Sequence, residues 1–81
     1  MNAQFLYNKG LEAAAKKDIN AAIYFIKGAT EITPLNPLYW TNLGGAYYTN
    51  HQLEEARQCW NRTLQLDPND DNAKRGLRAL Q

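Results

Sequence analysis

The sequence resembles itself when it is shifted by 34 residues, so that, for example, Gly10 aligns with Gly44. Small residues and helix breakers coincide in the same way, Ala22 with Ala56 and Pro34 with Pro68. Apolar residues coincide too, in the pairs Leu6 with Trp40, Ile19 with Leu53, Ile26 with Trp60 and Ile32 with Leu66. A fixed period of this size is the signature of stacked repeats, in which each repeat is one supersecondary unit. The sequence therefore predicts one unit used twice, over approximately residues 3–36 and 37–70.

Each unit carries the signals of two antiparallel helices joined by a turn. Asn36 before Pro37 is a typical helix start, and the stripe that follows has helical spacing and consists of Trp40, Leu43, Gly44 and Tyr47. A polar run at residues 49–52 predicts a turn. The second helix has a stripe formed by Leu53, Ala56, Trp60 and Leu64, and ends before Pro68. The first unit follows the same plan, with a turn near residues 16–18 and an end at Pro34.

A shorter helical pattern follows the second unit, over about residues 71–81. Asp70 and Asp71 suit a helix start, where carboxylates meet the positive end of the helix dipole. One face is apolar and consists of Ala73, Leu77 and Leu80, whereas the opposite face is basic and consists of Lys74, Arg75 and Arg78. This pattern predicts a helix that covers the last repeat, which makes five helices in an all-α chain.

The second unit resembles the tetratricopeptide repeat, a 34-residue motif that reads W-x2-L-G-x2-Y, then A-x3-F, then P. The matching residues in this sequence are Trp40, Leu43, Gly44 and Tyr47, then Ala56 and Trp60, and finally Pro68. Thr63 departs from the motif, since alanine is usual there. The first unit fits at Gly10, Ala22, Ala29 and Pro34, and departs at Leu6, Lys9 and Ala13. The resemblance implies a single α-solenoid domain over residues 1–81, with two antiparallel helix-turn-helix units, a capping helix and right-handed superhelical stacking. Small residues would let the helices of a unit approach closely, and Trp40, Tyr47 and Trp60 would fill the gaps between units.

The resemblance also implies a protein–protein interaction module that receives a peptide or partner segment on the concave face lined by the first helix of each unit. Helical spacing assigns to this face Tyr7, Asn8, Leu11, Leu38, Thr41, Asn42, Gly45 and Tyr48. We expect the asparagine amides to pair with an extended peptide backbone, and Gly45 to let a ligand come close. Some family members clamp a C-terminal carboxylate with lysines and asparagines here. Tyr7 and Leu11 replace the cation and the amide of that clamp, so it is not expected.

Self-association is the alternative function. Residues 23–26 are apolar for longer than one buried stripe requires, and repeat arrays generally need about three units to bury a continuous core. Contiguous exposed apolar surface usually marks an interface. The candidate residues for a homo-oligomer are Phe5, Tyr24 and Phe25.

Reactive groups are too few to predict an enzyme. His51 and Cys59 are the only residues of their kinds, and no acidic cluster has metal-ligand spacing. Gly44 and Gly45 lie inside a helical pattern, so they do not form a phosphate loop. We expect His51 in a solvated turn and Cys59 as a small, partly buried apolar residue, with no catalytic, cofactor or metal site.

Charge and hydropathy exclude two further classes of partner. Nine basic and eight acidic residues give a net charge of +1, whereas nucleic-acid binders of this size carry a basic excess. RNA binding, known for a related helical-hairpin repeat with a basic groove, is therefore a weak third hypothesis. The longest apolar run, Ala21 to Ile26, is far shorter than the ~20 residues of a membrane span, and residues 1–10 lack a secretory signal. A cytoplasmic protein with a protein or peptide partner is expected.

Overall fold

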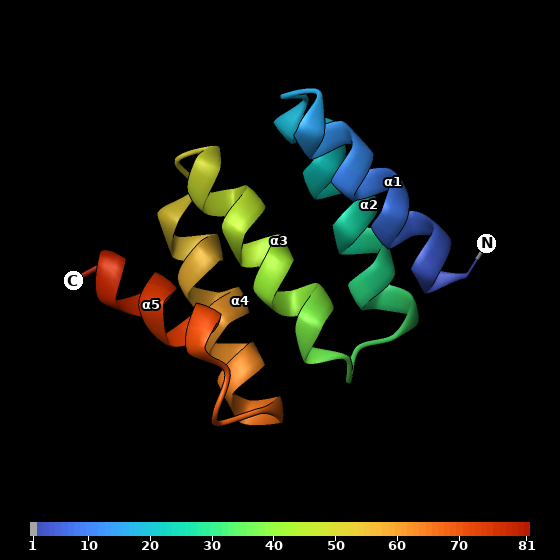
Figure 1. The fold of residues 1–81 in the computed structure, drawn as a ribbon. Coiled ribbons are helices and arrows are strands. Elements are labelled where there is room, and N and C mark those ends of the chain that lie inside the picture. The colour runs from blue at the N-terminus through green and yellow to red at the C-terminus, as the bar shows by residue number, and fades with distance from the viewer. Residues whose placement is uncertain (1) are drawn as a thin grey trace.

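The computed structural model describes residues 2–81 and contains five helices, which are α1 Ala3–Ala15, α2 Ile19–Ile32, α3 Pro37–Thr49, α4 Leu53–Leu66 and α5 Asp71–Ala79. No strand occurs in that range (Figure 1). The predicted all-helical class and the number of helices are confirmed. Met1, which the predicted domain includes, lies outside the described residues.

The 34-residue period holds in the backbone and in the N-terminal caps of α1, α3 and α5. Helices α1, α3 and α5 begin at residues 3, 37 and 71, and α2 and α4 begin at 19 and 53. The residues before α1, α3 and α5 are Asn2, Asn36 and Asp70, and each side chain accepts a bond from a backbone N–H of the first turn at 2.8–3.0 Å. These bonds satisfy donors that the start of a helix leaves without a partner.

The turns within the two units share one backbone conformation. Lys17 has φ 67° and His51, at the equivalent position, has φ 62°. The next residue in each turn donates its N–H back to the preceding helix at 2.9 Å, Asp18 to the carbonyl of Ala13 and Gln52 to that of Tyr47. The left-handed conformation costs a residue other than glycine about 1–2 kcal/mol, so both turns contain local strain.

Replacing Lys17 with glycine is therefore expected to stabilise the fold. Relief of the left-handed strain outweighs the extra freedom that glycine adds to the unfolded chain, which leaves a net gain of about 0.5–1 kcal/mol. Lys16 is a matched control, because it is also an exposed lysine but has φ −87°. Urea unfolding should show a higher midpoint for Lys17→Gly and an unchanged or lower one for Lys16→Gly. Equal midpoints would contradict the strain assignment.

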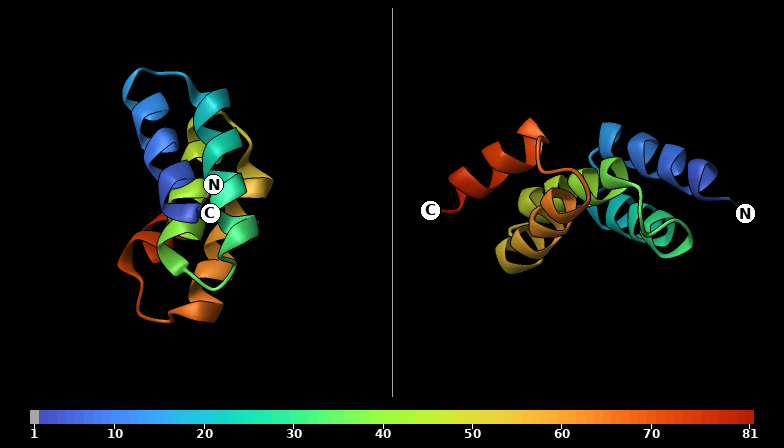
Figure 2. Two further views of the ribbon diagram at one scale, coloured as in Figure 1. Left: turned by 90° about the vertical axis from the view of Figure 1, so that its right-hand side faces the viewer. Right: turned by 90° about the horizontal axis from the view of Figure 1, so that it is seen from below.

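The helices form two layers. Helix α2 packs on both α1 and α3, and α4 packs on both α3 and α5. Viewed end-on, α1, α3 and α5 lie along one face, and α2 and α4 lie along the other (Figure 2). The first helix of each unit therefore shares a face with α5, as the repeat arrangement requires.

Two apolar clusters hold the layers together. The first joins the two units and contains Tyr7, Ile26, Ala29, Tyr39, Leu43 and Cys59. The second joins the second unit to α5 and contains Ala56, Trp60 and Ala73. Gly44 on α3 and Gly76 on α5 both face the Trp60 ring, where an added Cβ would collide with it. The absence of a side chain at these two positions lets α3 and α5 lie against one indole.

A buried polar network links α3, α4 and the start of α5. The Thr41 hydroxyl lies 3.0 Å from Thr63 Oγ1 and 3.3 Å from Asp70 Oδ2, and the Thr63 hydroxyl donates to the carbonyl of Cys59 at 3.1 Å. The Trp60 indole N–H donates to the carbonyl of Thr41 at 3.1 Å. The network gives a physical reason for threonine at position 63, where the repeat usually has alanine, because its hydroxyl pairs with Thr41 across the helix contact.

Candidate functional site

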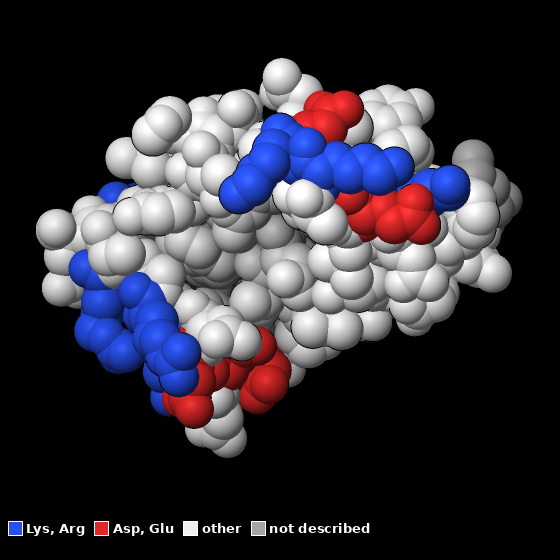
Figure 3. Space-filling model, turned by 45° about the horizontal axis from the view of Figure 1, so that its top comes forward, with Lys and Arg blue, Asp and Glu red and all other residues white. Residues whose placement is uncertain are grey.

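The face formed by α1, α3 and α5 carries most of the residues expected to contact a peptide. Four of the expected residues are exposed, namely Asn8, Leu11, Leu38 and Tyr48. Two more, Asn42 and Gly45, are half-buried. Figure 3 shows charged groups gathered at two borders of the visible surface, with a hollowed, uncharged area between them. The basic residues of α5 are Lys74, Arg75 and Arg78, and α1 carries Lys9.

Tyr7 and Thr41 differ from the expectation of open contact residues, because each is only 8% exposed. The Tyr7 ring packs 4.8 Å from the ring of Tyr39, centroid to centroid, where α1 meets α3. Burial, followed by the neighbouring Tyr39, raises the pKa of the Tyr7 hydroxyl. Thr41 is occupied by its network with Thr63 and Asp70. Both residues shape the face from beneath and offer a ligand little surface.

Asn42 is fixed by two hydrogen bonds of its amide nitrogen. Nδ2 donates to the carbonyl of Leu38 at 3.0 Å and to the Tyr7 hydroxyl at 2.9 Å. Within residues 2–81 its Oδ1 accepts no hydrogen bond. Asn8, at the equivalent position of α1, has the opposite arrangement, because its Oδ1 accepts from Gln4 Nε2 at 3.0 Å and its amide nitrogen is not used as a donor there. The face thus presents one amide acceptor and one amide donor.

Gly45 leaves the middle of this face open. A Cβ added there would meet no atom within 4 Å, in contrast to the neighbouring Gly44. Glycine lets another backbone approach closely when the space above it is empty. Tyr48, one turn further along α3, lies with its ring 5.8 Å from that of Trp60, and this contact supports its position at the edge of the face.

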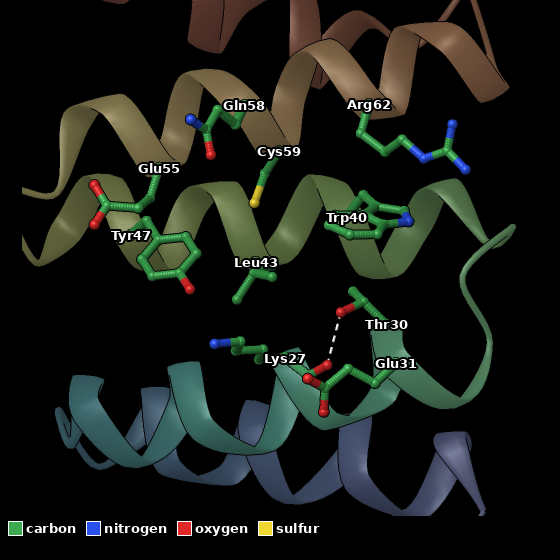
Figure 4. Close-up of a pocket in the computed structure, with 10 residues that line it drawn as sticks. All are labelled: Lys27, Thr30, Glu31, Trp40, Leu43, Tyr47, Glu55, Gln58, Cys59 and Arg62. Carbon is green, nitrogen blue, oxygen red and sulfur yellow. Dashed lines mark hydrogen bonds between the residues drawn. The ribbon is translucent and has the colours of Figure 1, made fainter.

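The opposite face contains a groove of about 530 Å³ between α2 and α4 (Figure 4). Its floor consists of Trp40, Leu43 and Tyr47 from α3. Its walls carry charged and polar groups that sequence reasoning did not single out, namely Lys27, Thr30, Glu31, Glu55, Gln58 and Arg62. Trp40 and Tyr47 are only half-buried, so they fill the space between the units incompletely. The 34-residue register alone gives no signal for this groove, because its width depends on the separation of α2 and α4.

Cys59 lies at the edge of this groove with its thiol buried. Burial raises the pKa of the thiol to about 12, and the Glu55 carboxylate adds to the rise. Because the thiolate is the nucleophilic form, Cys59 is unreactive at neutral pH. Cys59 is 5% exposed, so it is buried more completely than the partly buried position expected, and His51 lies exposed in its turn as expected.

The raised pKa of Cys59 makes stability fall at alkaline pH. The folded state favours the protonated thiol, so this stabilisation is complete below the ordinary pKa of 9.0 and is lost as the pH rises toward about 12. In that interval the loss approaches ~1.4 kcal/mol per pH unit. Urea unfolding at neutral pH and above pH 9 should show a steep decline for the unaltered chain and a shallower one for Cys59→Ala. Equal slopes would contradict the assignment of this pH dependence to Cys59.

The candidate self-association residues are only partly brought together. Tyr24 and Phe25 pack edge to face at 5.4 Å and line a second hollow, of about 490 Å³, on the outer side of α1 and α2. Phe5 does not line that hollow, where Leu6 takes its place. Instead the Phe5 ring lies beneath the ammonium group of Lys9, at 5.7 Å from its centroid.

Residues 2–81 contain no group of three His, Cys, Asp or Glu side chains that could hold a metal ion. Within the same range, every helix is too short or too polar to cross a bilayer.

The paired helices, their 34-residue register and the glycine contacts define a helical repeat protein. The family model of the tetratricopeptide repeat matches residues 37–70. An uncharacterized protein of Methanocaldococcus jannaschii is 32% identical over 65 residues, which cover 80% of this chain and 76% of that protein. The peroxisomal targeting signal receptor of Saccharomyces cerevisiae is 32% identical over 68 residues, which cover 84% of this chain and 11% of the receptor. The chain belongs to the tetratricopeptide repeat family, and the tetratricopeptide repeat is a protein-interaction fold.

Proposed function

We propose that the chain captures an extended peptide segment of a partner protein on the face formed by α1, α3 and α5. The observation that carries this proposal is the pair Asn8 and Asn42, at equivalent positions of the two units. Asn42 has a free amide oxygen held in place by the bonds of its nitrogen, and Asn8 has an available amide nitrogen. An extended peptide offers both an N–H donor and a carbonyl acceptor, which these two groups match.

The surroundings of the asparagines support a backbone ligand with apolar side chains. Leu11, Leu38 and Tyr48 are exposed around the pair and supply apolar contact. Gly45 gives the peptide backbone access to α3. The uncharged centre of the face favours an internal peptide segment over a free carboxylate, because burying an unpaired charge is costly. The yeast relative is by its name a receptor for a targeting signal, which also supports capture of a short segment.

Selection of a displayed library of random peptides against the chain, followed by calorimetric titration, tests the proposal. Asn8→Ala combined with Leu11→Ser should weaken binding of the selected peptides about tenfold or more, through loss of a hydrogen bond and an apolar contact. Both side chains are exposed, so the fold is retained. Asn61→Ala, at an exposed position of α4, is the matched control and should bind normally. Unchanged affinity in the double variant would refute capture on this face.

A further inference from the structure

The outer side of α2 carries large apolar residues that no described helix covers. Tyr24 is 74% exposed, and Ile32 and Leu35, near the other end of α2, are 50% and 69% exposed. Gly28 lies between them and lines the hollow of about 490 Å³ together with Leu6 and Phe25. Exposed large apolar residues on and just after one helix, with few charges among them, are typical of an interface.

Comparison with the second unit shows that the repeat fold does not require these residues. Thirty-four residues later, Tyr24, Phe25 and Gly28 correspond to Gln58, Cys59 and Arg62 of α4. Gln58 and Arg62 line the groove between α2 and α4, where the wall of the preceding helix supplies Lys27 and Glu31. The first unit has no such wall among the described residues, yet it is the more apolar at these positions. That combination favours contact with another helix over contact with water.

The charges on this surface are self-complementary. Lys27 and Glu31 are one turn apart on α2 and line the hollow. Neither forms an ion pair within residues 2–81, where the salt bridges are Lys9 with Glu12 and Arg57 with Glu54. Two-fold symmetry makes an interface isologous, so that each residue of one copy meets its complement on the other. If two copies of α2 cross antiparallel near residue 29, Lys27 of each copy lies opposite Glu31 of the other.

We propose that the chain forms a two-fold symmetric homodimer through antiparallel packing of α2 on α2 of a second copy. The same crossing places Tyr24 of one copy over Ile32 and Leu35 of the other, so that the three exposed apolar residues cover one another. The dimer leaves the face of α1, α3 and α5 open, so this inference is independent of peptide capture.

Sedimentation equilibrium from low micromolar to millimolar concentration tests the dimer. The unaltered chain should approach twice the monomer mass, and Tyr24→Ser should remain a monomer. Lys27→Glu should weaken dimerisation about tenfold or more, because it places like charges opposite each other twice per dimer. Combining Lys27→Glu with Glu31→Lys restores opposite charges at both contacts between the copies, so this double variant should dimerise again. If Lys27 served only to stabilise the fold, the second substitution would not restore the dimer.

Two controls make the outcome decisive. Thermal unfolding followed by circular dichroism should be unchanged for each variant in its monomeric state, since Tyr24, Lys27 and Glu31 are exposed. Tyr48→Ser, on the peptide face, should weaken peptide binding and leave the mass unchanged, which separates this inference from the proposed function. A monomer at millimolar concentration, or a double charge swap that fails to restore the Lys27→Glu dimer, would overturn the proposal.

Discussion

Replacing Trp60 with alanine is expected to lower the free energy of unfolding by about 3–5 kcal/mol, the usual cost of removing a buried aromatic side chain. Trp60 is 5% exposed and is the centre of the cluster that joins the second unit to α5. Its loss also removes the bond from its indole N–H to the carbonyl of Thr41. Domains have only about 0.05–0.15 kcal/mol of stability per residue, so much of the variant should be unfolded at physiological temperature.

Trp40→Ala is the matched control for this prediction. Trp40 is half-buried at the floor of the groove, and its indole N–H donates to the carbonyl of Pro34 at 2.7 Å. Because less of its surface is buried, its loss should cost clearly less than the loss of Trp60. Urea unfolding followed by circular dichroism measures both. Equal losses of unfolding free energy in the two variants, or a loss below ~1 kcal/mol for Trp60→Ala, would show that Trp60 does not hold α3, α4 and α5 together.

Gly44→Leu should destabilise the chain by about 1–3 kcal/mol through overpacking, because the new side chain must enter the space that the Trp60 ring occupies. The adjacent Gly45 provides an unusually close comparison, since a Cβ there meets no atom within 4 Å. Gly45→Leu should leave stability equal or raise it by up to ~1 kcal/mol, because glycine is a poor helix residue. Thermal unfolding distinguishes the two variants.

The variants Gly44→Leu and Gly45→Leu also distinguish an effect on stability from an effect on peptide binding. Gly45→Leu should fold normally but weaken binding of selected peptides, because its side chain fills the open space at the centre of the proposed binding face. If Gly44→Leu proved as stable as Gly45→Leu, the close contact of α3 with Trp60 would be wrong. If Gly45→Leu bound peptides normally, Gly45 would lie outside the binding face.

The helical architecture could be predicted because it depends on local sequence and on a period. Apolar stripes, breakers and the Asn36–Pro37 start define each helix, and the recurrence of Gly, Ala and Pro defines the unit. The caps at Asn2 and Asp70 follow the same period. The left-handed turn residues Lys17 and His51 could not be read in this way, because neither is a glycine or an asparagine.

The candidate site was harder to predict, because burial depends on the distance between neighbouring helices. Angular position on a helix assigned Tyr7 and Thr41 to the open face, but the approach of α1 to α3 buries Tyr7 against Tyr39. The pairing of Thr41 with Thr63 and Asp70 joins residues that are distant in sequence. The groove between α2 and α4 likewise depends on helix separation, which the residue pattern does not contain.

Amide chemical shifts test most directly the proposed capture of an extended peptide on the face of α1, α3 and α5. A selected peptide is titrated into isotopically labelled chain, and the backbone shifts are followed by residue. The largest changes are expected around Asn8, Asn42 and Gly45. Changes confined to α2 and α4 around Gln58 and Arg62, with the α3 face silent, would contradict the proposed capture and assign binding to the groove on the opposite side.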